Sequence, residues 1–214
     1  MTTVLLIRHG ESAANRDDMF AGNYDAELLP RGFEQAAASA KYIKENYKVD
    51  RVYASDLQRA YNTGKCVADA FGLDVTPDAS FREIDAGHWD AVTFDDIYKK
   101  YPEEFTVWMN DISRGYCPGG ETITELGKRV FGAIGRVVRE NEGKTIVIAS
   151  HATPVRVAYT LAKYGTLDKT QEIPWPSNAS VSVLYYDNGK WSCGDYSIDE
   201  HMGELCTFLP EGVE

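Results

Sequence analysis

Short apolar runs alternate with longer amphipathic stretches along this chain of 214 residues. The short runs are typical of strands buried in a parallel sheet, and they cover residues 4–7, 51–54 and 145–149. The longer stretches place apolar residues three to four positions apart, which predicts amphipathic helices. These helices are expected over residues 32–47, 57–71 and 122–138, near residues 94–101, and after residue 153.

Residues that favour helix ends and turns separate these elements. Ser55 and Thr122 each precede a glutamine or glutamate by three residues, which predicts a capping box at the start of a helix. Thr153 is expected to cap the next helix, and Gly72 to end the second. Residues 187–189 read Asp-Asn-Gly between two strand-like segments, which predicts a β-hairpin.

Strands that alternate with helices predict an α/β fold, a three-layer αβα sandwich with a mainly parallel sheet. The C-terminal hairpin is expected to add an antiparallel strand. We expect a single domain over residues 1–214, with a mobile tail from about residue 197 that includes His201. Residues 76–120 mix proline, glycine, aromatic and acidic residues, and their pattern resolves only one helix.

Composition excludes several classes of protein. Hydrophobic residues make up 43% and charged residues 26%, the balance of a globular protein, and no apolar run is long enough to span a bilayer. A net charge of −11 disfavours nucleic acid as a partner. Four cysteines far apart argue against a disulfide framework, and the N-terminal residues lack the pattern of a signal peptide. We therefore expect a cytoplasmic protein without membrane partners.

Candidate chemistry follows directly after the predicted strands. Arg8 and His9 follow the first, Arg59 lies soon after the second, and His151 follows the third. Ligands of such sheets bind outside the carboxyl ends of the strands, so these side chains are expected at one rim. Arginine grips phosphate oxygens in pairs, and helix N-termini attract anions. Because surface charge is screened by salt, this cluster can hold a phosphate on an acidic protein.

Five segments, in order, resemble the motifs of the histidine phosphatase superfamily, which includes cofactor-dependent phosphoglycerate mutase. The segments are Arg8-His9-Gly10-Glu11 with Ser12 and Asn15, Ser55-Asp56-Leu57-Gln58-Arg59-Ala60 with Thr63, Phe81-Arg82-Glu83-Ile84-Asp85 with Gly87 and Trp89, Pro118-Gly119-Gly120-Glu121-Thr122, and Ser150-His151. The resemblance covers nearly the whole chain and implies a phosphoglycerate mutase-like fold.

The resemblance implies a role for each residue of the cluster. His9 would be the nucleophile that becomes phosphohistidine. Arg8, Arg59 and His151 would bind the three non-bridging oxygens of the phosphoryl group. Glu83 would protonate the leaving oxygen and then deprotonate the attacking water. No metal or other cofactor is implied, because the arginines supply the positive charge.

Other positions extend the expected site or depart from the family pattern. Asn15 and residues 34–35 are expected to line the pocket. Ala152 is expected to contact the substrate, although the family has glycine after the second histidine. Arg31 stands in a segment that lacks the usual threonine, and His88 replaces a frequent glutamate. His88 is interpreted as an exposed loop residue, with a place in the pocket as the alternative.

Three functions are open at this stage. The favoured one is a phosphatase that hydrolyses a small phosphorylated metabolite, a phosphomonoester. A phosphoglycerate mutase is the first alternative, but the family's mutases carry an insertion that the short segment between Glu83 and Cys117 lacks. A non-catalytic module that binds phosphorylated ligands is the second. The sequence leaves the physiological substrate and the oligomeric state open, with a homodimer as one alternative.

Overall fold

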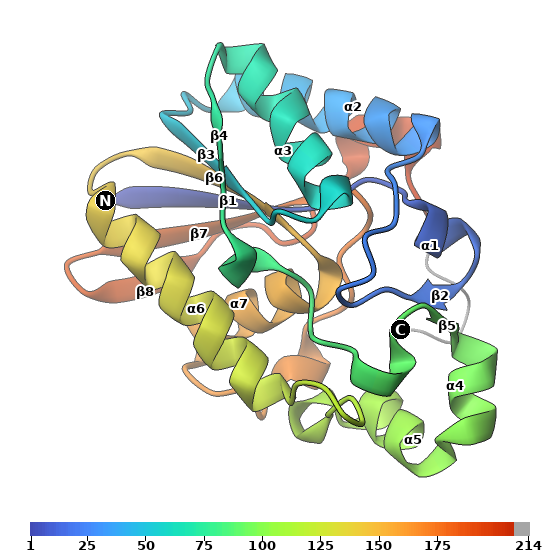
Figure 1. Cartoon of the computed structure of the whole chain (residues 1–214). Coiled ribbons are helices and arrows are strands. Elements are labelled where there is room, and N and C mark those ends of the chain that lie inside the picture. The colour runs from blue at the N-terminus through green and yellow to red at the C-terminus, as the bar shows by residue number, and fades with distance from the viewer. Residues whose placement is uncertain (208–214) are drawn as a thin grey trace.

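A six-stranded sheet lies at the centre of the computed structural model, which describes residues 1–207 (Figure 1). Its order is β4-β3-β6-β1-β7-β8. The strands are β1 (Thr2–Arg8), β3 (Arg51–Ala54), β4 (Val75–Pro77), β6 (Thr145–Ser150), β7 (Val181–Asp187) and β8 (Lys190–Cys193). Strands β1, β3, β4 and β6 run parallel to one another, whereas β7 runs antiparallel to β1 and β8 antiparallel to β7. The predicted α/β fold with a mainly parallel sheet and a C-terminal hairpin is confirmed.

Helices cover both faces of this sheet. The helices are α1 (Ala13–Arg16), α2 (Pro30–Asn46), α3 (Gln58–Phe71), α4 (Phe94–Lys100), α5 (Pro102–Asn110), α6 (Ile123–Glu140) and α7 (Ala152–Tyr164), and four of them, α2, α3, α6 and α7, cover the sheet (Figure 1). In Figure 1, α2 and α3 lie on one side of the strands and α6 and α7 on the other. The result is the predicted three-layer arrangement.

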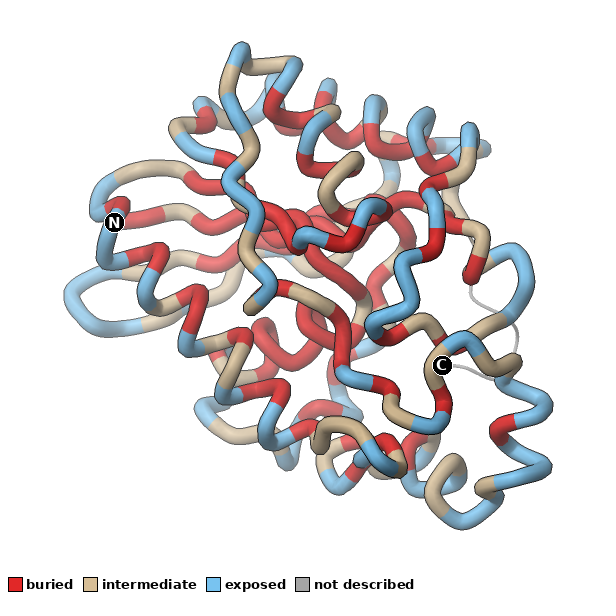
Figure 2. The backbone as a smooth tube through the Cα atoms, viewed as in Figure 1, coloured by how far each residue is buried: buried red, intermediate tan, exposed pale blue. Residues whose placement is uncertain are grey.

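Strand β1 explains why the core has two halves. Its side chains alternate between the faces of the sheet. Val4 and Leu6 pack into the cluster that holds the apolar faces of α6 and α7, whereas Leu5 and Ile7 pack into the cluster with α2 and α3. All four are almost completely buried, as is most of the central sheet (Figure 2). The ends of β1 and β6 are thereby held rigidly between two helical layers.

The cap residues differ in part from the predictions. Thr122 caps α6 as expected, and its hydroxyl accepts a hydrogen bond from the Glu125 backbone N–H. The predictions for Ser55 and Thr153 are wrong, because α3 is capped by Leu57 and α7 by His151. The turn from β6 into α7 is shorter than expected, so His151 itself takes the extended cap conformation.

Residues 197–207, the described part of the predicted mobile tail, pack against the rest of the protein. Ile198 pairs with Val181 at the start of β7, and the 3-10 helix Glu200–Leu205 packs on α2. The His201 ring stacks on Tyr42, with ring centroids 4.7 Å apart. The remainder of the predicted tail lies outside the described residues.

The segment that the sequence pattern left largely unresolved forms a small unit beside the sheet. The predicted helix near residues 94–101 is confirmed as α4. A two-stranded sheet joins β2 (Met19–Phe20) to β5 (Val92–Thr93), and the short 3-10 helices Ala79–Phe81, Gly87–Trp89 and Ile112–Arg114 connect the unit to the core. Phe20, Trp89 and Trp108 pack edge to face at its centre, so aromatic contacts stabilise it.

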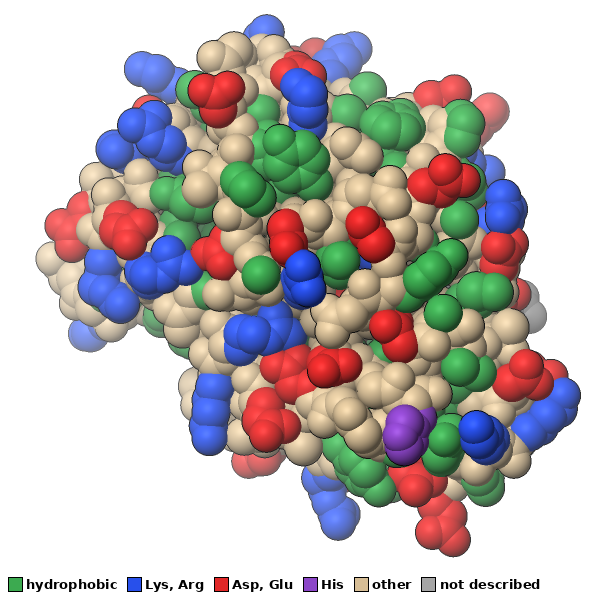
Figure 3. All heavy atoms as spheres, in the orientation of Figure 1, with side chains coloured by type: hydrophobic (Ala, Val, Ile, Leu, Met, Phe, Trp, Pro, Cys, Tyr) green, Lys and Arg blue, Asp and Glu red, His purple; other side chains and the backbone are tan. Residues whose placement is uncertain are grey.

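The surface has two features that bear on partners. On the face shown in Figure 3, acidic and basic side chains are intermingled, so this face presents no continuous basic patch for nucleic acid. Among the helices of residues 1–207, none has the combination of length and apolar character needed to traverse a bilayer.

Candidate active site

The pairing of β1 with β6 brings the two predicted histidines together. Arg8 stands opposite Ser150 in the parallel register, so His9 and His151 leave the sheet side by side. The His9 backbone N–H donates to the Ser150 carbonyl at 2.9 Å. The two imidazole rings meet edge to face, with centroids 5.2 Å apart. The predicted convergence at one rim of the sheet is observed.

The His9 ring is held in one tautomer. Its Nδ1 lies 2.7 Å from the Gly10 carbonyl oxygen, and because a carbonyl can only accept, Nδ1 carries the proton. Burial, together with the nearby charges of Arg59 and Arg8, holds the pKa of His9 well below its usual value. The ring is therefore neutral near pH 7, with an unprotonated Nε2 that can act as a nucleophile.

The loop after His9 is packed tightly. The Gly10 backbone N–H donates to the Thr63 hydroxyl at 3.1 Å. A Cβ atom on Gly10 would clash with the backbone of Gly32 at the start of α2, which explains the glycine at this position. The Glu11 N–H donates to the Gln35 side chain at 2.8 Å. These contacts fix the turn that presents His9.

His151 is a second neutral imidazole. Its Nε2 lies 2.8 Å from the Ser55 hydroxyl, and its buried Nδ1 has no hydrogen-bond partner among the described residues. Burial lowers its pKa well below the usual value, and the charge of Arg59 lowers it further. If Ser55 donates to Nε2, the ring proton stays on Nδ1, which is then a free donor beside His9.

Two buried guanidinium groups adjoin the histidines. Arg8 Nη1 donates to the Pro176 carbonyl at 2.6 Å. Arg59 holds the loop of residues 21–24 through the carbonyls of Ala21, Gly22 and Tyr24 at 2.7–3.0 Å. The Nε atoms of both arginines are buried without a partner in the described part of the chain. Burial lowers the pKa of Arg8 to about 10, which leaves it charged at neutral pH.

Glu83 points toward the start of α7. One carboxyl oxygen accepts from the Ile84 N–H at 2.8 Å, and the other from the Thr153 N–H at 3.2 Å. Burial raises the pKa of Glu83, although these backbone hydrogen bonds and the charge of Arg59 oppose the shift. A raised pKa favours the protonated carboxyl group, as a general acid requires.

The expected substrate-binding residues Asn15 and Ala152 flank the cluster. Ala152 is the first residue of α7, directly after His151. The Asn15 side-chain oxygen accepts from Ser12 and from Asn178. Asn178, which the motifs did not reveal, also donates to the His9 carbonyl at 3.1 Å. Asn178 stands in no pattern that sequence reasoning could have used.

Arg31 and His88, the two departures from the family pattern, make contacts with residues other than the two histidines. Arg31 forms an ion pair with Glu11 at 3.5 Å and donates to backbone carbonyls of residues 204–206. It therefore fastens the C-terminal segment to α2. His88 is exposed and its ring stacks on Tyr101. It is exposed as expected, but it lies in the 3-10 helix Gly87–Trp89 and not in a loop.

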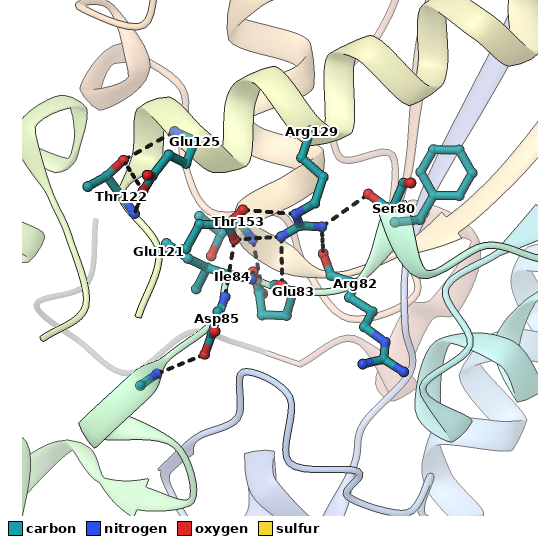
Figure 4. Close-up of polar contacts among 12 residues, drawn as sticks. Ser80, Arg82, Glu83, Ile84, Asp85, Glu121, Thr122, Glu125, Arg129 and Thr153 are labelled. Carbon is teal, nitrogen blue, oxygen red and sulfur yellow. Dashed lines mark hydrogen bonds and ion pairs between the residues drawn. The ribbon is translucent and has the colours of Figure 1, made fainter. Parts of the chain in front are cut away.

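A surface cavity of about 560 Å³ adjoins Glu83. Its charged lining residues are Arg82, Glu83, Asp85, Glu121, Glu125 and Arg129. The two histidines do not line it, so it flanks the histidine cluster rather than containing it. Arg129 of α6 lines this cavity. Figure 4 shows Arg129 bonded to the backbone that carries Glu83. Within residues 1–207, no group of three or more His, Cys, Asp or Glu side chains is arranged to hold a metal ion.

Comparison with known proteins adds an independent result. Residues 4–199 match the profile of the histidine phosphatase superfamily (branch 1). The chain is 30% identical to phosphoserine phosphatase 1 of Hydrogenobacter thermophilus over 205 residues, which are 96% of each chain. Its fold resembles that of YhfR from Bacillus stearothermophilus, with a TM-score of 0.89, 25% identity, and coverage of 94% of this chain and 100% of the other. A mycobacterial glucosyl-3-phosphoglycerate phosphatase shares the fold at a TM-score of 0.85 and 23% identity, over 91% of this chain and 98% of that one. The chain therefore belongs to the histidine phosphatase superfamily.

Proposed function

We propose that this protein is a phosphatase that hydrolyses a small phosphorylated metabolite through a phosphohistidine intermediate on His9. The family assignment and the phosphatases among its relatives support an enzyme that cleaves phosphate esters. The proposal adds the role of each residue. His9 is the nucleophile, and Arg8, Arg59 and His151 hold the phosphoryl oxygens. Asn15 and the backbone at Ala152 complete the binding site.

One observation carries this assignment of roles. Of the five buried side-chain nitrogen atoms without a hydrogen-bond partner in the described residues, three belong to this cluster: Arg8 Nε, Arg59 Nε and His151 Nδ1. Buried polar atoms are almost always hydrogen-bonded, and each orphan costs free energy. These three belong to the residues predicted to bind the three phosphoryl oxygens. A bound phosphoryl group, which carries only acceptors, would satisfy all of them together.

In the first chemical step, His9 Nε2 attacks phosphorus. The phosphorus–nitrogen bond forms as the bond to the leaving oxygen breaks, and Glu83 gives its proton to that oxygen. The product alcohol departs and phosphohistidine remains. Arg8 and Arg59 stabilise the charge on the transferring group, which is the main requirement in phosphoryl transfer.

The second step releases phosphate. Glu83, now a carboxylate, takes a proton from water as the water oxygen attacks phosphorus. The phosphorus–nitrogen bond breaks, inorganic phosphate forms, and His9 and the protonated Glu83 are regenerated. The same carboxyl group therefore serves as acid and then as base.

We further propose that the enzyme works in the cytoplasm on a small phosphomonoester. All four cysteines are free, as is usual in a reducing compartment. The Hydrogenobacter relative is a phosphoserine phosphatase, which supports a metabolite rather than a macromolecule as substrate.

A panel of phosphomonoesters, with p-nitrophenyl phosphate among them, tests the proposal. The purified protein should release inorganic phosphate from several of them, and His9→Ala should release none. A parallel assay supplies 3-phosphoglycerate with its bisphosphate cofactor. Net isomerisation faster than hydrolysis would identify a mutase instead. Binding without turnover of any ester would identify a non-catalytic module.

A further inference from the structure

We infer that Arg129 and Glu121 form a clamp that positions Glu83 for proton transfer. The inference rests on the proposed role of Glu83 as the general acid. Neither residue is placed against the phosphoryl group, so both are positioning residues.

The segment around Glu83 needs such support. Residues 83–86 belong to no helix or strand, so their backbone polar groups lack the partners that regular structure provides. A segment outside regular secondary structure can rotate about its backbone dihedral angles unless other groups bind it. The catalytic value of a general acid depends on hydrogen-bond reach to the leaving oxygen, so its backbone must be held.

Arg129 binds this backbone from α6 (Figure 4). Its Nη1 donates to the carbonyls of Ser80 and Arg82 at 3.1 and 3.0 Å. Its Nη2 donates to the carbonyl of Glu83 itself at 3.0 Å. One planar group thus fixes three carbonyls within four residues, at and just before the catalytic carboxyl group.

Glu121 completes the clamp. Its two carboxylate oxygens accept from Arg129 Nε at 2.9 Å and Nη2 at 2.6 Å, which fixes the plane of the guanidinium group. The same carboxylate accepts from the Asp85 N–H at 3.2 Å, and the Glu121 N–H donates to the Asp85 carbonyl at 2.9 Å. The backbone is therefore held on both sides of Glu83.

The inward contacts of Glu83 depend on that support. Its carboxyl oxygens meet the N–H groups of Ile84 and Thr153. A small rotation of the backbone at Glu83 would move the carboxyl group away from Thr153 and from the leaving oxygen. Lysine cannot replace Arg129, because an ammonium group lacks the rigid fork that spans three carbonyls.

The test compares two leaving groups. For Arg129→Lys, the phosphorylation step should slow by up to about 10²-fold with glycerol phosphate, the scale expected for a misplaced catalytic group. With p-nitrophenyl phosphate, whose leaving group needs no proton, the burst of p-nitrophenolate should change far less. Glu121→Gln keeps the shape of the side chain and should show a smaller loss that is again greater with glycerol phosphate than with p-nitrophenyl phosphate. This variant replaces Arg129→Lys as the test if the lysine variant fails to fold.

A control and a double variant separate positioning from general damage. Arg136→Met removes the ion pair between α6 and Asp78, which precedes this segment, without touching the Glu83 carbonyl. It should leave both rates near wild type. If Arg129 acts through Glu83, Arg129→Lys should add little further loss in a Glu83→Gln background.

Three results would overturn the inference. They are equal losses with the two substrates, a loss in Arg136→Met as large as that in Arg129→Lys, and full additivity in the double variant. A failure of the proposed function is recognised separately. In that case Glu83→Gln alone would show no dependence on the leaving group.

Discussion

The Ser55 hydroxyl lies 2.8 Å from His151 Nε2, in contact with the second histidine of the site and not at the cap of α3. The same oxygen accepts from the Leu57 N–H at 3.3 Å. With that bond made, the hydroxyl proton is free to point at the imidazole. We propose that Ser55 donates this proton to Nε2 and so favours the tautomer of His151 that carries its ring proton on Nδ1, toward the proposed phosphoryl site.

Ser55→Ala should lower kcat/KM by about tenfold, the loss expected when one hydrogen bond of about 1.4 kcal/mol is removed. The matched control is Ser39→Ala, which removes a buried serine that contacts the ring of His201 at 2.9 Å. The control should keep its catalytic constants. Wild-type kcat/KM in Ser55→Ala, or an equal loss in both variants, would contradict the tautomer role.

Arg8→Lys and Arg59→Lys should each lower kcat by about 10²–10³-fold, since each loses a donor to the transition state. Lysine keeps the charge, but its ammonium group cannot bind the backbone carbonyls that the arginine Nη atoms hold and also donate to the phosphoryl group as Nε does. Arg51→Lys is the control, because Arg51 is exposed at the first position of β3, at the end of the parallel strands opposite the histidines. Steady-state kinetics on one substrate measure all three. Full activity in either of the first two would rule out that arginine as the proposed phosphate ligand.

Glu83→Gln should affect the two leaving groups differently. With an alkyl phosphate, phosphorylation should slow by about 10²–10⁴-fold, because the alkoxide needs a proton as it leaves. With p-nitrophenyl phosphate the burst should persist, followed by slow dephosphorylation, because the base that activates water is missing. Rapid-mixing experiments measure both phases, with His88→Ala as a control from the same segment. An equal loss in the burst phase for both substrates would exclude Glu83 as the acid and point to Asp85.

The pH dependence follows from the shifted pKa values of Glu83 and His9. Burial raises the pKa of Glu83, and phosphorylation requires its protonated form, so the rate should fall as pH rises through that pKa. The pKa of His9 lies well below its usual value, so the rate should not fall as pH drops through 6.5. Comparing wild type with Glu83→Gln on one alkyl phosphate cancels titration of the substrate. The alkaline decline should disappear in the variant, and its persistence would assign it to another group.

Much of the fold could be predicted, because strong periodicity accompanies burial on a defined face. Residues 4–7 and 146–149 are apolar and almost completely buried in the centre of the sheet, and the capping box at Thr122 is a purely local signal. Strand β4 was missed because it has only three residues and none of them is buried. The unit around β5 and α5 is stabilised by aromatic contacts between distant segments, which leave no period in the sequence.

The candidate site was likewise only partly predictable from the sequence. Arg8, His9 and His151 were predictable, because strand ends place them and the chemistry of phosphate requires such residues. Asn178 and the contact between Arg129 and Glu83 were not, because they depend on how segments far apart in the chain pack together. The cap prediction for Ser55 failed because the tertiary contact with His151 outweighed a local signal.

The central claim is a covalent phosphoryl group on His9, and rapid chemical quench with a ³²P-labelled substrate tests it most directly. The label should appear on the protein within the first turnover, resist alkali, be lost in acid, and map to Nε2 of His9, since Nδ1 is held by the Gly10 carbonyl. The His9→Ala variant should take up no label and release no phosphate. Turnover without a labelled protein, or a label on any other residue, would contradict the mechanism.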